Sequence, residues 1–146
     1  MRYYFAPMEG ITDAPYRRVH HSFFPGLTSY YMPFISPTMH RTLTHSESRD
    51  LPMADSVPFR AVPQILTKVP EDFLWASDQC AQRGYDEVNL NVGCPSGTVV
   101  SKGKGAGMLA DPAKLDEFLN AIFRDTPLSI SVKRSEEHTS ELQSPQ

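Results

Sequence analysis

The stretch Glu87-Val88-Asn89-Leu90-Asn91-Val92-Gly93-Cys94-Pro95 decides the fold class of this chain. Polar and apolar residues alternate over 87–92, as they do in a β-strand, and a helix-like segment precedes them. Gly93 allows the chain to turn, and Pro95 fixes the backbone just after the thiol of Cys94. A cysteine at the carboxyl end of a parallel strand lies where α/β folds place their chemistry.

Strand-like and helix-like segments alternate along the rest of the chain. We expect strands over residues 3–6, 27–32, 60–66, 87–92 and 128–132. Pro63 speaks against a central position for the third strand, because proline cannot donate to a ladder. Repeated β-then-α units predict a parallel sheet with right-handed crossovers. Five strands fit either an open doubly wound sheet or just over half of an eight-stranded barrel, and periodicity alone does not separate the two.

Four helices are expected between these strands. The first follows Asp13 as N-cap and carries Tyr16, Val19 and Phe23 on one face. The other three lie within 36–48, over 70–83 with Gly84 at the carboxyl end, and after the Asp111-Pro112 cap. The last of these has an apolar stripe typical of a helix that lies on a sheet, made of Leu115, Phe118, Leu119 and Ile122. Residues 50–58 and 93–110 read as loops.

Composition excludes several classes of protein. The 146 residues suffice for one ordinary domain, and a formal net charge of −3 gives no electrostatic footprint for nucleic acid. No stretch is long and apolar enough to span a bilayer, and the N-terminus lacks the features of a signal peptide. Two cysteines do not make a disulfide framework, so the cytoplasm is the expected compartment. The histidines show no metal-binding constellation, and the sequence does not indicate an oligomeric state.

Residues 134–146 differ from the rest of the chain because they lack apolar periodicity. Their sequence, Arg-Ser-Glu-Glu-His-Thr-Ser-Glu-Leu-Gln at its start, matches the in-frame translation of a common sequencing adapter. We therefore expect a non-native tail over 134–146 and exclude it from the reasoning on fold. Residues 1–133 are then expected to be a fragment of a longer protein; the resemblance described next implies that they are the N-terminal portion of its catalytic domain.

Several expected strand ends together resemble the tRNA-dihydrouridine synthase family. The motifs, in chain order, are Ala6-Pro7-Met8-Glu9-Gly10-Ile11-Thr12-Asp13, Pro63-Gln64-Ile65, Asn89-Leu90-Asn91-Val92-Gly93-Cys94-Pro95, Lys102-Gly103-Lys104-Gly105-Ala106-Gly107-Met108-Leu109 and Ser131-Val132-Lys133. The family usually has Ala in place of Glu9, and an arginine where this chain has Ser135. Five motifs in order make this resemblance specific, and it covers essentially all of 1–133.

The resemblance implies an FMN-binding TIM barrel followed by a small helical domain that binds tRNA. The fold class is then α/β, an incomplete TIM (β/α)8 barrel with about the first five strands and four helices. The implied reaction reduces the C5–C6 double bond of a uridine in tRNA, and NADPH reduces the flavin. FMN, NADPH and tRNA are the implied cofactors and substrate, with no metal and no membrane.

The resemblance also assigns roles to individual residues. Cys94 would be the general acid that protonates C5 of the uracil ring. Lys133 would place a cation beside the flavin, and Gln64 would hydrogen-bond to the edge of the isoalloxazine. The backbone around Pro7 and Met8 would pack on the ring system.

Three further residues are expected to contact the substrate or the flavin. Asn91 can donate to and accept from the incoming uracil or the flavin. Lys102 and Lys104 are available to tRNA phosphates from a glycine-rich segment, which reads either as a mobile loop that closes over the substrate or as a flexible solvated loop with no such role. A Rossmann phosphate loop does not fit, because this segment does not join a strand directly to a helix. Cys80 lies among apolar residues of a helix and is expected in the core.

Two alternatives to this function remain open at the level of sequence. Another FMN barrel that acts on a free pyrimidine, such as a dihydroorotate dehydrogenase, also has an Asn-rich strand end with Cys-Pro. The glycine before Cys94 and the Lys-Gly-rich segment favour the synthase. The second alternative is an inactive truncated polypeptide, which lacks barrel units six to eight and exposes two unpaired sheet edges. We expect such a polypeptide neither to hold FMN tightly nor to reduce tRNA.

Overall fold

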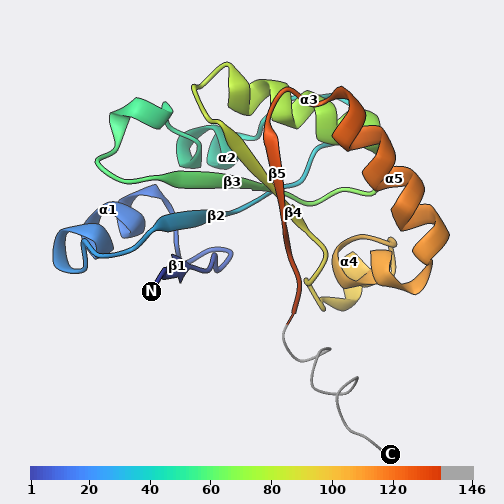
Figure 1. Ribbon diagram of the computed structural model, residues 1–146, viewed down its shortest axis with the longest axis horizontal. Helices are drawn as coiled ribbons and strands as arrows, with labels where there is room; N and C mark the ends of the chain where they lie inside the picture. Colours follow the sequence, from blue (N-terminus) through green and yellow to red (C-terminus); the bar gives the residue numbers. More distant parts are fainter. Residues whose placement is uncertain (136–146) are drawn as a thin grey trace, which may run out of the picture.

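The computed structural model describes residues 1–135, which form a five-stranded sheet flanked by helices (Figure 1). The strands are β1 (Tyr4–Phe5), β2 (Ser29–Ile35), β3 (Ala61–Ile65), β4 (Glu87–Asn91) and β5 (Ser129–Lys133). They lie in the order β1-β2-β3-β4-β5, and every neighbouring pair is parallel. A doubly wound sheet reverses its strand order at a switch point, whereas a barrel adds each strand beside the last. The strand order therefore identifies an incomplete TIM barrel, and the five expected strands are confirmed.

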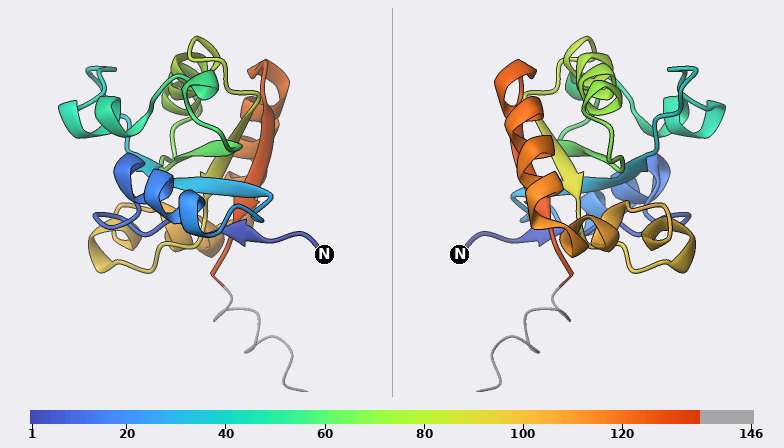
Figure 2. Two further views of the ribbon diagram at one scale, coloured as in Figure 1. Left: turned by 90° about the vertical axis from the view of Figure 1, so that its left-hand side faces the viewer. Right: turned by 90° about the vertical axis from the view of Figure 1, so that its right-hand side faces the viewer.

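The helices are α1 (Ala14–Phe23), α2 (His45–Asp50), α3 (Pro70–Ala81), α4 (Gly97–Val100) and α5 (Pro112–Asp125), with 3-10 helices at Ala54–Ser56 and Gly105–Ala110. The longer helices α3 and α5 cover one face of the sheet, and the short helix α4 lies beyond the carboxyl end of β4 (Figures 1 and 2). Three of the four expected helices are present near their expected bounds. The one expected within 36–48 is confined to 45–50, where it forms α2. The expectation of loops over 50–58 and 93–110 was wrong in part, because each segment contains helical turns.

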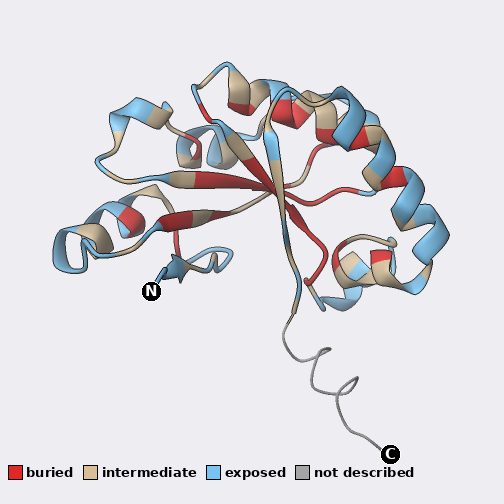
Figure 3. Cartoon of the chain, viewed as in Figure 1, coloured by how far each residue is buried: buried red, intermediate tan, exposed pale blue. Residues whose placement is uncertain are grey.

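The main core lies between the sheet and helices α3 and α5, where buried residues are concentrated (Figure 3). Phe73 of α3 has no exposed surface and meets Phe118 of α5 edge to face, with ring centroids 6.0 Å apart. Val88 and Leu90 of β4 point into the same core and are also fully buried. Cys80 is part of this core, as expected from its apolar neighbours.

Strand β2 is longer than expected and carries an irregularity beside β3. It continues through Pro33 to Ile35, and its register with β3 shifts between Tyr31 and Phe34. Tyr31 pairs with Val62 and Phe34 pairs with Gln64, so two residues of β2 lie opposite Pro63 alone. Neither Pro33 nor Pro63 has an N–H to donate, and a bulge is where a sheet tolerates such residues. This is why Pro63 can occupy a central strand.

Helix α1 packs differently from the expectation. Tyr16, Val19 and Phe23 are 43%, 59% and 73% exposed, and the buried residue of this helix is Arg17. The Arg17 guanidinium donates to the backbone oxygens of Thr12 at 2.9 Å and Asp50 at 2.7 Å, and it pairs with the Asp50 carboxylate. Arg17 thereby ties the β1–α1 loop to helix α2. The apolar face is exposed because α1 lies beside β1, the edge strand of the described sheet.

The Phe73 contact leads to a prediction on stability. Replacing this buried ring in Phe73→Ala should lower the free energy of unfolding by about 3–5 kcal/mol, because a cavity remains between α3 and α5. Phe123→Ala on α5 is the matched control, since Phe123 is 55% exposed and should change stability by less than about 1 kcal/mol. Urea denaturation followed by circular dichroism measures both values. Equal effects of the two substitutions would contradict the assigned core.

Candidate functional site

An open cavity of about 690 Å³ lies at the carboxyl ends of the strands. Most of the predicted site residues line it: Pro7, Met8, Gln64, Asn91, Cys94 and Lys133. The rest of the wall is formed by Ala6, Glu9, Pro33, Phe34, Gly93, Pro95 and residues 134–135. The remaining two predicted residues, Lys102 and Lys104, do not line this cavity.

The strand register brings the side chains of β3, β4 and β5 together. Gln64 pairs with Asn89, and Asn89 pairs with Ser131, so these three residues form one row across the sheet. Asn91 pairs with Lys133 two residues further along. Because side chains alternate along a strand, all of them point to the face opposite the apolar core. The inner side of the incomplete barrel is thus polar.

Asn91 fixes the backbone of the candidate catalytic cysteine. Its Oδ1 accepts hydrogen bonds from the N–H groups of Gly93 at 3.0 Å and Cys94 at 2.9 Å. Its Nδ2 therefore faces away from the turn and donates to Gln64 Oε1 at 3.0 Å. The Asn91 side chain is 5% exposed, so most of its hydrogen-bonding capacity is used inside the protein.

The orientation of Asn91 determines the orientation of a whole row of carboxamides. Since Gln64 presents Oε1 to Asn91, its Nε2 donates to Asn89 Oδ1 at 2.8 Å. Asn89 Nδ2 in turn donates to Ser131 Oγ at 2.9 Å. Gln64 and Asn89 are 1% and 2% exposed, so the row is buried and its members satisfy one another. The Gln64 amide consequently faces the cavity in one fixed orientation.

The loop that carries Pro7 and Met8 is held by Thr12. The Thr12 hydroxyl accepts from Met8 N at 2.8 Å and donates to Met8 O at 3.2 Å, and Gly10 adopts a φ of +74° in the turn. Arg17 then holds the Thr12 carbonyl from below. These contacts keep the exposed side chain of Met8 beside the cavity.

The glycine-rich segment after Cys94 is folded onto it. The N–H of Ala106 donates to Cys94 O at 3.0 Å, and a Cβ on Gly105 would lie 2.8 Å from that oxygen. Gly105 also has a φ of +56°, so its lack of a side chain serves close packing. Lys102 is exposed at the surface of this segment, and Lys104 is half-buried. The segment between Cys94 and α5 therefore contains two short helices, α4 and the 3-10 helix at Gly105–Ala110, and is not an open loop.

Gly93 lies against residues 134–135, the first two residues of the segment that is expected to be non-native. Its φ is not positive, and a Cβ there would lie 2.5 Å from Ser135 N and 2.7 Å from the carbonyl carbon of Arg134. The chain that follows β5 therefore passes directly over Gly93. Larger residues at this position would displace the end of β5, which carries Lys133.

The two thiols have contrasting surroundings. Cys94 is half-buried at the cavity, whereas Cys80 is fully buried and both are free. Burial raises the pKa of the Cys80 thiol to about 12. Within residues 1–135, no three His, Cys, Asp or Glu side chains are grouped so that they could hold a metal ion. In the same range, no helix has the length and apolar character that crossing a membrane requires.

Sequence reasoning missed Asn89, Ser131, Thr12 and Lys68. Lys68, just after β3, lies beside the glycine-rich segment, with its Nζ 3.6 Å from a Cβ placed on Gly103. Asn89 and Ser131 occupy the same alternating positions as Asn91 and Lys133, two residues before them. That alternation was a usable signal, because strand residues two apart share a face.

Comparison with known proteins agrees with this geometry. The sequence profile of the family described as dihydrouridine synthase (Dus) matches residues 4–142. This chain belongs to the dihydrouridine synthase family. It is 29% identical over 134 residues to tRNA-dihydrouridine synthase B of Pasteurella multocida, an alignment that covers 90% of this chain and 39% of that protein.

Two other relatives extend the comparison. A probable tRNA-dihydrouridine synthase of Staphylococcus aureus (strain COL) is 34% identical over 137 residues, which cover 88% of this chain and 39% of the relative. The tRNA-dihydrouridine(20/20a) synthase of Vibrio vulnificus is 39% identical over 64 residues, covering 44% and 20% of the two chains. The chain thus spans about 39% of the length of the first two relatives.

The contrast between the thiols predicts selective labelling of this chain. At pH 8, iodoacetamide should alkylate Cys94 and leave Cys80 unmodified, because the thiolate is the reactive form and burial disfavours it at Cys80. Mass spectrometry of the native protein should show one added group, which Cys94→Ser removes and Cys80→Ser retains. Alkylation of Cys80 in the folded protein would contradict the described core.

The role of Asn91 predicts a local change around Cys94. Asn91→Ala leaves Gly93 N–H, Cys94 N–H and Gln64 Oε1 without a partner and should cost about 1–3 kcal/mol of stability. Amide hydrogen exchange at Gly93 and Cys94 should accelerate beyond what this global loss explains. Asn120→Ala is the matched control, because Asn120 is an exposed asparagine of α5. Unchanged protection of both amides would show that Asn91 does not hold the turn.

Proposed function

We propose that the protein, at the full length of its relatives, reduces the C5–C6 double bond of a uridine in tRNA. The observation that carries this proposal is the placement of Cys94, whose backbone Asn91 fixes at the mouth of a cavity that also contains Gln64 and Lys133. Membership of the dihydrouridine synthase family supports the same reaction. We place this reaction in the cytoplasm, where tRNA and NADPH are available.

The residues around the cavity fit FMN as the cofactor. A volume of about 690 Å³ lies in the range of cofactor pockets, and the walls combine apolar surface from Pro7 and Met8 with polar groups. Lys133 offers a cation to the flavin. Gln64 lines the cavity and has one N–H that the polar row does not use, which is available to a carbonyl of the ring edge. Bound FMN, reduced by NADPH, supplies the hydride that C6 of the uracil accepts.

Cys94 provides the proton that completes the reduction. When C6 gains a hydride, negative charge develops on the uracil ring until C5 is protonated. The Sγ of Cys94 holds a proton at the cavity and delivers it to C5. Because Asn91 and Ala106 fix the backbone of Cys94, the thiol reaches one region of the cavity only. Asn91 also has one N–H left with which to contact the uracil.

The lysines near the cavity serve to hold the RNA. Lys102 and Lys104 contact phosphates, and Lys68 adds a third positive charge next to them. The target base must leave its stack to enter the cavity, at a cost of a few kcal/mol. Contacts with phosphates outside the cavity offset part of this cost. The overall net charge of −3 makes such a local cluster necessary.

Substitution of Cys94 tests the proposal in the protein at its full length. Cys94→Ser should slow single-turnover formation of dihydrouridine in unmodified tRNA by about 100-fold or more, because a hydroxyl is a far weaker acid than a thiol. Reduction of the flavin by NADPH should remain unchanged. Cys80→Ser is the matched control and should keep the rate of tRNA reduction.

Two results would contradict the proposal. One is a Cys94→Ser protein that reduces tRNA as fast as the unsubstituted enzyme. The other is turnover of free dihydroorotate without any turnover of tRNA, which would identify an enzyme that acts on a free pyrimidine. Liquid chromatography with mass spectrometry of the digested tRNA measures the dihydrouridine that is formed. The change in absorbance of the free pyrimidine measures the turnover of dihydroorotate.

A further inference from the structure

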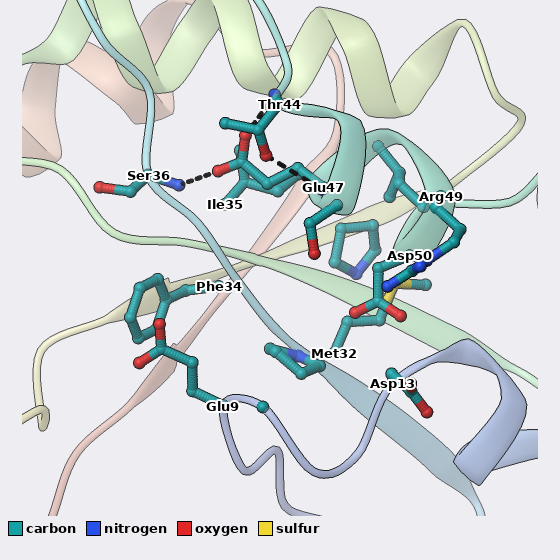
Figure 4. A pocket seen from close by; sticks show the side chains of 15 residues that line it. Glu9, Asp13, Met32, Phe34, Ile35, Ser36, Thr44, Glu47, Arg49 and Asp50 are labelled. Carbon is teal, nitrogen blue, oxygen red and sulfur yellow. Dashed lines mark hydrogen bonds between the residues drawn. The ribbon is translucent and has the colours of Figure 1, made fainter.

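A second cavity of about 350 Å³ adjoins the one that contains Cys94 (Figure 4). The β1–α1 loop, the end of β2 and helix α2 form its walls. Glu9, Pro33 and Phe34 line both cavities, so the two share one wall. Its volume lies within the range of small-molecule sites, and neither the proposed flavin nor the proposed uridine site uses its far side.

The second cavity has flat apolar surface on one side. Phe34 is half-buried, which leaves part of its ring accessible. The buried side chains of Met32, Ile35 and Leu51 continue the apolar wall. An aromatic ring beside such a wall offers a stacking platform for a base of any sequence.

Most carboxylates around this cavity are already engaged. Glu47 accepts from Ser36 N at 2.9 Å and Thr44 N at 2.8 Å, as Figure 4 shows. Asp50 pairs with buried Arg17, and Asp13 caps helix α1. Glu9 differs, since its exposed carboxylate has no hydrogen-bond or ion-pair partner among residues 1–135. A free acceptor pair therefore lies at the wall that joins the two cavities.

We propose that the second cavity binds a guanine base of the substrate RNA next to the target uridine, through the Glu9 carboxylate and the Phe34 ring. This inference rests on the proposed function, because it takes RNA as the substrate. Adjacent nucleotides of an unstacked strand can occupy two cavities that share a wall. Single-stranded RNA is commonly recognised in this way, by stacking and by hydrogen bonds to base edges.

The choice of guanine follows from the pattern of donors and acceptors. A carboxylate accepts two parallel hydrogen bonds, and guanine presents two adjacent donors, N1–H and N2–H. Adenine and cytosine place a ring acceptor beside their amino group, and uracil flanks its N3–H with two carbonyl oxygens. Each of these arrangements brings an acceptor against Glu9. Arg49 also lines the cavity, but the four acidic residues Glu9, Asp13, Glu47 and Asp50 leave an excess of negative charge that disfavours a phosphate as the occupant.

Replacement of Glu9 by alanine separates the contribution of its carboxylate from that of the Phe34 ring. Alanine would leave the Phe34 platform but remove the acceptor pair. The expected consequence of Glu9 is therefore selection of the neighbouring base, and the chemistry at Cys94 does not require it.

Titration with nucleosides tests this inference on the chain itself. The ¹⁵N-labelled protein is titrated with guanosine, adenosine and uridine, and amide chemical shifts report affinity and location. Guanosine should bind at least about tenfold more tightly than uridine, with shifts at Glu9, Gly10 and Phe34. Glu9→Gln should weaken guanosine about tenfold and favour adenosine, since a side-chain amide matches the donor and acceptor of adenine. Glu71→Gln, at an exposed glutamate of α3, is the matched control.

Equal affinities for guanosine and uridine would overturn the inference, as would no detectable guanosine binding. So would a Glu9→Gln protein that keeps the preference, or shifts confined to residues outside the second cavity. These results leave the proposed reduction of uridine intact, because that activity is measured separately through Cys94. If the protein binds guanosine but its full-length form does not reduce tRNA, the proposed function is wrong and the guanine site is not contradicted.

Discussion

The carboxamide oxygen of Asn91 accepts from two successive backbone N–H groups, those of Gly93 and Cys94, and these donors cannot change their identity. A side-chain amide can turn over, but a backbone N–H always donates. The direction of every later hydrogen bond in the row is therefore fixed from this end, through Gln64 to Asn89. The hydroxyl of Ser131 at the other end of the row can donate or accept, so it does not set a direction and accepts from Asn89. The orientation of the Gln64 amide is thus a consequence of the turn at Cys94.

Burial of the polar row costs free energy of desolvation, and the hydrogen bonds between its members offset this cost. Burying an amide without partners costs several times what a satisfied hydrogen bond contributes, and a partly satisfied network is worse than an apolar interior. A slip of β4 by one residue against β3 or β5 would turn Asn89 toward the apolar core and Leu90 toward the cavity. The row therefore also specifies the register of the three strands. The register that builds the barrel is therefore the same register that places the side chains of the polar row.

Much of this architecture was predictable from the sequence. Alternation within 87–92 and the apolar stripe of 112–125 gave the strands and helices, and the strand ends indicated where Cys94 and Lys133 would meet. Periodicity describes one element at a time and did not predict the strand order, which the resemblance implied through the barrel fold. The partners of Asn89 depend on the register of two other strands, and burial of Arg17 depends on the position of Asp50. Such pairings involve residues far apart in the chain and leave no local signal.

The glycine-rich segment after Cys94 illustrates why a composition pattern can have more than one physical cause. Glycines allow a backbone to approach a phosphate, but they equally allow it to approach another backbone. Gly105 and Gly107 do the second, because a Cβ on either would lie 2.8 Å from a carbonyl oxygen. One of those oxygens belongs to Cys94 and accepts from Ala106, while the Cys94 N–H donates to Asn91. The residue is therefore held at both its N–H and its C=O, and rotation about χ1 is the freedom that its thiol retains.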